Sequence, residues 1–172
     1  MARAAGPAYT VECAPGDNLM FHAAIYRAAP GSVIVVKAGD VDYAVSGGNV
    51  CRVAQKRGVA AFVVDGVVRD VAEARENGFP IFARGVSSIP GGKEIVTELN
   101  QPVQCGGVRV EPGDCVVGDE EGIVVVPLLT LAETLEKAQA RATKDAAETL
   151  EDWEAAHHAR IEAILRGKGF RG

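Results

Sequence analysis

In the first half of the chain, short runs of β-branched residues alternate with stretches of helical spacing, and this alternation restricts the fold more than any other feature. The runs at 32–37, 59–64 and 80–83 predict buried strands. Helices are expected between them at 49–57 and 69–77, and a glycine follows each helix as its stop signal. Strand–helix–strand units of this length form parallel sheets with helices on their faces, so the chain is predicted to be an α/β protein.

Turn residues divide this region. Asp17 or Asn18 is expected to cap a helix over 19–28, which Pro30-Gly31 stops. Asp65-Gly66 is expected to end the strand that begins at residue 59.

The pattern changes in the second half. Residues 103–126 contain short apolar runs separated by tight turns, which predicts a meander or a small barrel. Residues 128–166 are rich in Ala, Glu, Lys and Arg without Gly or Pro, and predict a long helix broken at most once. We therefore divide the chain into an α/β domain at 1–127 and a helical extension of the same domain at 128–172. We expect the extension to pack at a subunit interface; the alternative is an amphipathic helix docked on its own domain.

Composition excludes several classes of protein. The net charge is −5 and no Lys/Arg-dense face is visible, which argues against nucleic acid as the main partner. No run of 18 apolar residues is present and the N-terminus lacks the apolar core of a signal peptide, so no membrane partner and a cytoplasmic location are expected. The four cysteines form no Cys-x-x-Cys pair, so they predict buried small hydrophobes rather than a zinc or redox site.

Two segments carry candidate chemistry. Gly47-Gly48-Asn49-Val50 precedes a predicted helix, where unpaired backbone N–H groups can bind a carboxylate or phosphate. A plain glycine-rich turn is the alternative.

Arg69-Asp70 follows a strand at the edge of the sheet where α/β proteins bind ligands. Arg can hold a carboxylate in a fork and one Asp with waters can hold Mg²⁺, so together they suit a 2-oxo acid. The alternative is a helix-capping Asp beside a surface Arg.

The other polar residues are weaker candidates on their own. His22 lies on an apolar helix and is expected to be structural, Lys93 lies in a loop, and Asp119-Glu120-Glu121 is expected to be a solvated turn.

The order and spacing of the motifs over residues 5–145 resemble one family, the RraA-like proteins. It contains class II pyruvate aldolases acting on 4-hydroxy-4-methyl-2-oxoglutarate and 4-carboxy-4-hydroxy-2-oxoadipate, and regulators of RNase E activity. Some members were once labelled demethylmenaquinone methyltransferases. The resemblance implies a three-layer β/β/α swivelling domain that forms a trimer, or a hexamer of two trimers, with active sites at subunit boundaries. The motifs that carry it are Gly16-Asp17-Asn18, Pro30-Gly31, the glycine-rich helix start at 47–50, Val64-Asp65-Gly66-Val67-Val68-Arg69-Asp70, Phe79-Pro80-Ile81-Phe82-Ala83-Arg84-Gly85, Gly106-Gly107-Val108, Pro112-Gly113-Asp114 and Asp119-Glu120-Glu121-Gly122-Ile123.

The resemblance also assigns roles. The backbone amides of Gly47, Gly48, Asn49 and Val50 would bind pyruvate, and Arg69 would contact the substrate. Asp70 would anchor Mg²⁺ or Mn²⁺, largely through waters. His22 and Lys93 match further polar residues of the aldolase site, and Asp145 falls where an acidic residue from a neighbouring subunit is expected.

The chain departs from the aldolases in two places. They carry an acidic residue directly after the first glycine of the loop, where it positions the water that acts as acid and base; this chain has Gly48, and neither Asn49, Asp40 nor Asp42 is an obvious substitute. They also carry N-terminal helices, expected to supply another acidic residue across the interface, before the strand that here begins at Gly6-Pro7-Ala8.

Two hypotheses follow. The first is a metal-dependent lyase that cleaves a 4-hydroxy-2-oxo acid to pyruvate or decarboxylates oxaloacetate, with Arg69 on the substrate and Asp70 on the metal. The second is a non-catalytic protein that binds and inhibits a ribonuclease E-like partner, which the loss of the acid at position 48 favours. The resemblance favours the enzyme, because the ribonuclease regulators lack a proper Arg-Asp pair. A methyltransferase is rejected, because no Gly-x-Gly-x-Gly loop follows a first strand.

Overall fold

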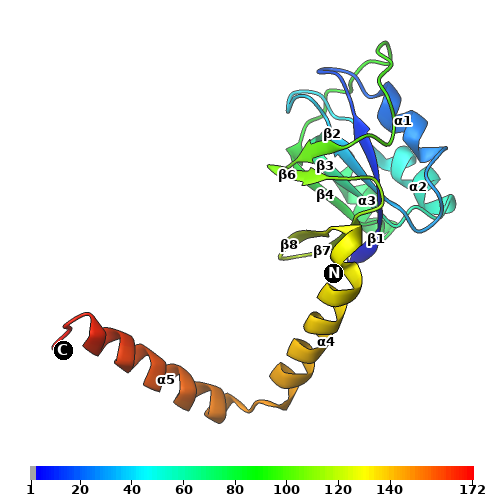
Figure 1. Cartoon of the computed structure of the whole chain (residues 1–172). Helices are drawn as coiled ribbons and strands as arrows, with labels where there is room; N and C mark the ends of the chain where they lie inside the picture. The colour runs from blue at the N-terminus through cyan, green and yellow to red at the C-terminus, as the bar shows by residue number, and fades with distance from the viewer. Residues whose placement is uncertain (1–2) are drawn as a thin grey trace. The chain divides into compact units, whose positions relative to one another are not determined.

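The computed structural model describes residues 3–172, and these residues separate into two compact units. The first unit ends at Leu131 and contains all the strands; the second begins at Ala132 and is helical. Helices α1, α2 and α3 lie on one side of the sheet in the first unit (Figure 1).

The first unit is built on a six-stranded sheet of order β4-β3-β2-β1-β7-β8. Strands β1 to β4 pair in parallel, whereas β7 is antiparallel to the first half of β1 and to β8. The two central strands, β2 and β3, are predominantly apolar runs, as strands buried on both faces require. The strands are β1 (Ala4–Glu12), β2 (Val33–Lys37), β3 (Ala61–Val68), β4 (Ile81–Val86), β7 (Cys115–Asp119) and β8 (Gly122–Val126).

Alternate residues of β2 and β3 point to opposite faces of the sheet and pack into two separate apolar clusters. Ile34 and Val36 of β2, with Phe62 and Val64 of β3, belong to the helix side of the sheet. They pack against α1 (Leu19–Ile25), α2 (Gly48–Lys56) and α3 (Val71–Glu76). The residues between them, Val35 and Val63 among others, pack on the opposite face against the hairpin of β5 (Val103–Cys105) and β6 (Val108–Val110). The hairpin, the sheet and the helices are the three layers of the β/β/α fold that the family resemblance implies.

Two details differ from the sequence prediction. Asp65-Gly66 does not end β3, which continues to Val68 with a register shift between Val64 and Val67. Gly66 is required there because a side chain would overlap that of Ala38 on the neighbouring segment, so this glycine marks a close approach rather than a turn. The strands of 103–126 form no barrel; β5–β6 is a separate hairpin, and β7–β8 extends the main sheet.

The C-terminal helical region is broken once, as predicted. A 3-10 turn, η1 (Leu128–Thr130), leads into α4 (Leu131–Ala147), and α5 (Leu150–Gly167) follows. Thr149 caps the start of α5, because its hydroxyl accepts the backbone N–H of Asp152 at 3.1 Å.

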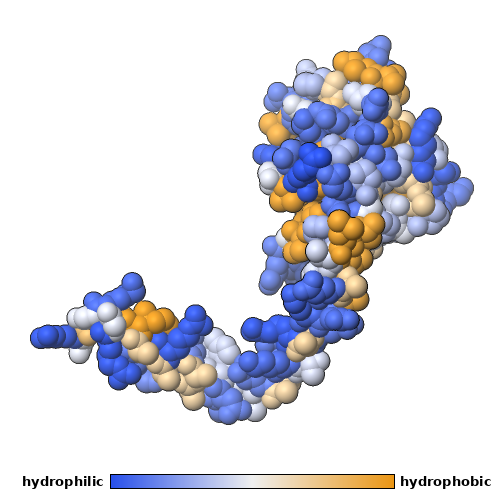
Figure 2. Space-filling model, viewed as in Figure 1, coloured by the Kyte–Doolittle hydropathy of each residue, from blue (hydrophilic) through white to orange (hydrophobic). Residues whose placement is uncertain are grey.

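Neither helix of this region buries a residue among those described. Figure 2 shows apolar side chains gathered near the start of α4, where Leu128 and Leu129 are 59% and 98% exposed. Packing of this region at a subunit interface stays a prediction. Among residues 3–172, no helix combines the length and the apolar character needed to cross a membrane.

The core depends on Phe62, which is fully buried and contacts Phe21 and Phe79 edge-on with ring centroids 4.8 Å apart in each pair. Replacing Phe62 with Ala removes both contacts and leaves a cavity, so the free energy of unfolding should fall by about 3–5 kcal/mol. Urea denaturation measures this loss. Val124→Ala on exposed β8 is the control and should change stability by less than about 0.5 kcal/mol; an equal loss in both variants would contradict the prediction.

Candidate functional site

The candidate site is organised by five consecutive buried residues, 44–48, which lie outside the strands and end at Gly48, the first residue of α2. Buried backbone outside a strand must find hydrogen-bond partners individually. Here the N–H of Val45 donates to Val67 at 3.1 Å, and the N–H of Arg69 donates to the carbonyl of Ser46 at 2.9 Å. On the other side, Ala44 exchanges hydrogen bonds with Ile89 and Gly91. The segment therefore joins the end of β3 to the loop after β4.

The start of α2 lies directly against the start of α3. A side chain on Gly47 would come within 2.5 Å of Asp70 Oδ2, and a side chain on Gly48 would overlap the carboxylate of Glu73. Glycine at both positions leaves room for these side chains to approach the backbone closely, and neither glycine has an unusual backbone conformation. Two carboxylates consequently meet the first turn of α2, whose N–H groups and dipole favour negative charge.

Asp70 occupies an unusual position. Its backbone is left-handed, with φ of 57° and ψ of 37°, and although it precedes α3 its side chain does not cap that helix. Instead, Asp70 Oδ2 accepts the backbone N–H of Gly48 at 3.0 Å. The helix-capping alternative for Asp70 is therefore wrong: the side chain binds the N-terminus of the neighbouring helix.

Arg69 stands beside it on the same rim. Its Nε lies 3.8 Å from Asp70 Oδ2, and the two side chains are 45% and 36% exposed. At this exposure the ion pair contributes little to stability, so the guanidinium is available to a ligand. Arg69, Asp70 and the start of α2 thus lie side by side, the arrangement that the family resemblance implies.

His22 contacts the buried segment 44–48, and the charge of Lys93 acts on His22. His22 Nε2 lies 3.3 Å from the carbonyl of Val45, one residue before Ser46. Burial lowers the pKa of His22, and the charge of Lys93 lowers it further, so the imidazole is neutral near pH 7. Lys93 is exposed. Their predicted catalytic roles stay predictions.

Asp145 belongs to the second unit and sits on α4. Both of its carboxylate oxygens accept from Arg141 Nε, one turn earlier, at 2.7 and 2.9 Å. Its predicted role across a subunit interface also stays a prediction.

Asp17 is a positioning residue that sequence reasoning treated only as a possible cap. Its Oδ1 accepts the N–H of Leu19 at 2.8 Å, which starts α1, while its Oδ2 accepts the N–H groups of Glu94 and Ile95 at 2.5 and 3.2 Å. Asp17 therefore holds the loop that carries Lys93. No local pattern reveals this, because 77 residues separate Asp17 from Glu94.

Sequence reasoning also did not identify Glu73 as a residue of the site. It lies three residues after Asp70, a spacing that places both side chains on the same side of a helix start, and this spacing was the available signal.

The site suits a hard divalent cation held mainly by water. Among the described residues, no group of three His, Cys, Asp or Glu side chains could enclose a metal. Asp70 nevertheless offers a partly exposed carboxylate: its Oδ2 accepts the N–H of Gly48, and its Oδ1 makes no hydrogen bond among the described residues. One carboxylate plus several waters is how Mg²⁺ is commonly bound, so the donor chemistry fits Mg²⁺ or Mn²⁺.

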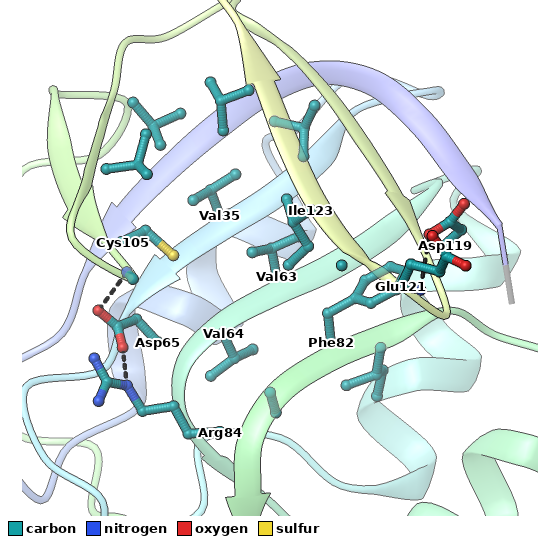
Figure 3. Close-up of a pocket in the computed structure, with 18 of the residues that line it drawn as sticks. Val35, Val63, Val64, Asp65, Phe82, Arg84, Cys105, Asp119, Glu121 and Ile123 are labelled. Atoms are coloured by element: carbon teal, nitrogen blue, oxygen red, sulfur yellow. Dashed lines mark hydrogen bonds and ion pairs between the residues drawn. The ribbon is translucent and has the colours of Figure 1, made fainter. Parts of the chain in front are cut away.

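A second feature, a cavity of about 860 Å³, lies between the sheet and the strands of the other layer (Figure 3). Its walls are mainly apolar side chains such as Val35 and Val63. At one end Asp65 pairs with Arg84 and accepts the N–H of Gly106 at 2.8 Å; the Arg84 contact holds the pKa of Asp65 below its ordinary value. The residues to which the family resemblance gives roles in the site (Arg69, Asp70, Gly47–Val50, His22, Lys93 and Asp145) are absent from its lining, so the cavity is separate from the Arg69–Asp70 surface.

The three-layer fold agrees with comparisons to known proteins. The chain matches the RraA-like family model, described as Aldolase/RraA, over residues 1–125. The chain therefore belongs to the RraA-like family.

Individual relatives carry two kinds of name. A protein of Halalkalibacterium halodurans named "Putative 4-hydroxy-4-methyl-2-oxoglutarate aldolase" is 43% identical over 143 residues, covering 83% of this chain and 68% of the relative. The 4-hydroxy-4-methyl-2-oxoglutarate aldolase of Thermus thermophilus is 33% identical over 112 residues, covering 64% and 68%. The crystal structure of Streptomyces coelicolor RraAS2, described as an unusual member of the RNase ES inhibitor RraA protein family, aligns with a TM-score of 0.75 at 32% identity, covering 84% of this chain and 75% of that one.

The Asp17 contacts make stability depend on pH. Burial opposes its ionisation, but the N–H groups of Glu94, Leu19 and Ile95 outweigh burial and hold the pKa of Asp17 below its ordinary value of 3.8. A carboxylate with a lowered folded-state pKa stabilises the fold fully above its unfolded-state pKa, and this stabilisation is lost as pH falls through the folded-state pKa. Asp17→Asn should thus cost about 1–3 kcal/mol at pH 7, and the difference from the parent should shrink below about pH 4.

Denaturant titrations of parent and variant between pH 3 and pH 7 measure this difference. The exposed Asp42, changed to Asn, is the control and should show no such convergence. A parent-to-variant gap that is constant over the whole range would rule out the contribution of the Asp17 charge.

Proposed function

We propose that the protein is a divalent-metal-dependent lyase of the class II pyruvate aldolase type, which cleaves a 4-hydroxy-2-oxo acid to pyruvate. The observation that carries this proposal is the meeting of Arg69, Asp70 and the first turn of α2 on one surface, joined by the hydrogen bond from Gly48 to Asp70. The aldolase names of relatives up to 43% identical support the same reaction class.

The residues divide the work between binding and charge stabilisation. The N–H groups of Asn49 and Val50, in the first turn of α2, lack partners within the helix and would hold the substrate carboxylate. Arg69 would bind the C2 oxygen, where negative charge develops as the C3–C4 bond breaks and the enolate of pyruvate forms. Asp70 would hold Mg²⁺ or Mn²⁺, which supplies Lewis-acid polarisation of the 2-oxo group when bound.

The same surface would decarboxylate oxaloacetate. Loss of CO₂ from oxaloacetate leaves the same pyruvate enolate, so it needs the same binding of the carboxylate and the same stabilisation at the C2 oxygen. It requires no base to deprotonate a hydroxyl group.

Asp70→Asn separates the charge of Asp70 from its shape. Asn tolerates a left-handed backbone and its amide oxygen can still accept the N–H of Gly48, so the fold should persist while the anionic ligand is lost. We expect pyruvate release from 4-hydroxy-4-methyl-2-oxoglutarate with Mg²⁺ to fall by about 100-fold or more in Asp70→Asn and in Arg69→Lys. A lactate-dehydrogenase-coupled assay reports the rate.

Arg75→Lys, on the exposed last turn of α3, is the matched control and should keep full activity. Parental rates in Asp70→Asn, or no pyruvate from the parent with either metal, would reject the proposal.

A second candidate function is inhibition of a ribonuclease E-type enzyme. The likeness to Streptomyces coelicolor RraAS2 favours it, and the net charge of −5 is compatible with docking on a basic surface. We expect purified protein to capture an RNase E-type ribonuclease at micromolar concentration and to slow cleavage of a short RNA, with binding that weakens as salt rises. Absence of binding at that concentration would eliminate this candidate.

A further inference from the structure

The carboxylate of Glu73 occupies the volume into which a side chain at position 48 would project. An ideal Cβ on Gly48 would overlap Glu73 Oε2 and would lie 2.7 Å from Glu73 Cδ. Gly48 is buried, whereas Glu73 is exposed, so the carboxylate covers the start of α2 from the solvent side. It therefore lies on the same surface as the amides of Asn49 and Val50.

Glu73 and Asp70 differ in the hydrogen bonds and ion pairs that their side chains make. Asp70 Oδ2 accepts the N–H of Gly48 and faces Arg69. Across residues 3–172, by contrast, the structure contains no hydrogen bond or ion pair to the Glu73 side chain. A carboxylate that is accessible and not engaged by a cation is available to accept a proton.

Aldol cleavage needs such a group and decarboxylation does not. In cleavage, a base takes the proton of the C4 hydroxyl, the C4–O bond becomes a carbonyl, and the C3–C4 electron pair becomes the enolate of pyruvate. The protonated base then returns the proton to C3, so that pyruvate forms and the base is restored. In oxaloacetate decarboxylation the C3–C4 electron pair forms the same enolate while CO₂ leaves, and water can protonate C3.

We propose that Glu73 is the proton-transfer group for aldol cleavage at this site, acting on the C4 hydroxyl directly or through one water. This proposal rests on the lyase function above and adds to it the residue that serves one of the two reactions. The family resemblance expects an acidic residue directly after Gly47, but this chain has Gly48 there. In the proposal, Glu73 on α3 supplies that carboxylate instead.

The test compares two reactions in one variant. Glu73→Gln keeps the size and polarity of the side chain but cannot take a proton. We expect its kcat for cleavage of 4-hydroxy-4-methyl-2-oxoglutarate to fall by about 100-fold or more, while its kcat for oxaloacetate decarboxylation stays within about threefold of the parent. Its Kd for Mg²⁺, measured by calorimetry without substrate, should be unchanged. Glu76→Gln, one turn further along α3, is the matched control and should be unchanged in all three measurements.

A second variant displaces the same carboxylate without replacing it. Gly48→Ala keeps the backbone amide and adds a methyl group where the Glu73 carboxylate lies, so the flexible end of Glu73 must move. We expect this variant to lose cleavage at least tenfold more than decarboxylation, with its Tm close to that of the parent.

The outcomes are distinct. Selective loss of cleavage in both variants supports the proposal. Parental cleavage by Glu73→Gln overturns it, and so does an equal loss of both reactions with weaker Mg²⁺ binding, which would make Glu73 a metal ligand. A parent that performs neither reaction rejects the lyase function itself, and the role of Glu73 with it.

Discussion

The buried segment 44–48 is the constraint on which the site depends. Five consecutive buried residues outside a strand would leave their polar backbone groups unpaired unless other parts of the chain came to them. The end of β3, the loop after β4 and the side chain of Asp70 all do so. Because one segment binds all three, the surface that carries Arg69 cannot shift without breaking buried hydrogen bonds, each worth about 0.5–1.5 kcal/mol.

The same segment brings two carboxylates next to backbone N–H groups that could bind an anion. The two glycines at its end let Asp70 and Glu73 approach the first turn of α2, where the backbone N–H groups point outward. Asp70 uses one of those groups, and the next two stay available to a substrate carboxylate. A cation held by Asp70 and the guanidinium of Arg69 would balance the added charge, which is why a metal-dependent reaction on an anionic substrate suits this arrangement.

Much of this fold follows from local patterns. The β-branched runs and their spacing predict β2, β3 and β4 with the helices between them, because strands buried on both faces must be apolar throughout. The errors occur where a local signal has two meanings. Gly66 resembles a strand terminator but lies inside β3, since what requires glycine is the side chain of Ala38 on another segment. Asp70 likewise has the position of a helix cap, yet its hydrogen bond goes to a different helix.

The sequence by itself determined which groups reach the rim of the sheet. The order of strands, helices and turns places Arg69, Asp70 and residues 47–50 at the ends of neighbouring elements, because parallel strands share one edge. Only the tertiary structure decided which of these groups touch. The packing of α3 against α2 places the carboxylate of Glu73 over Gly48, and Asp17 holds the loop that carries Lys93. Contacts of this kind depend on how helices and loops pack, which no spacing along the chain specifies.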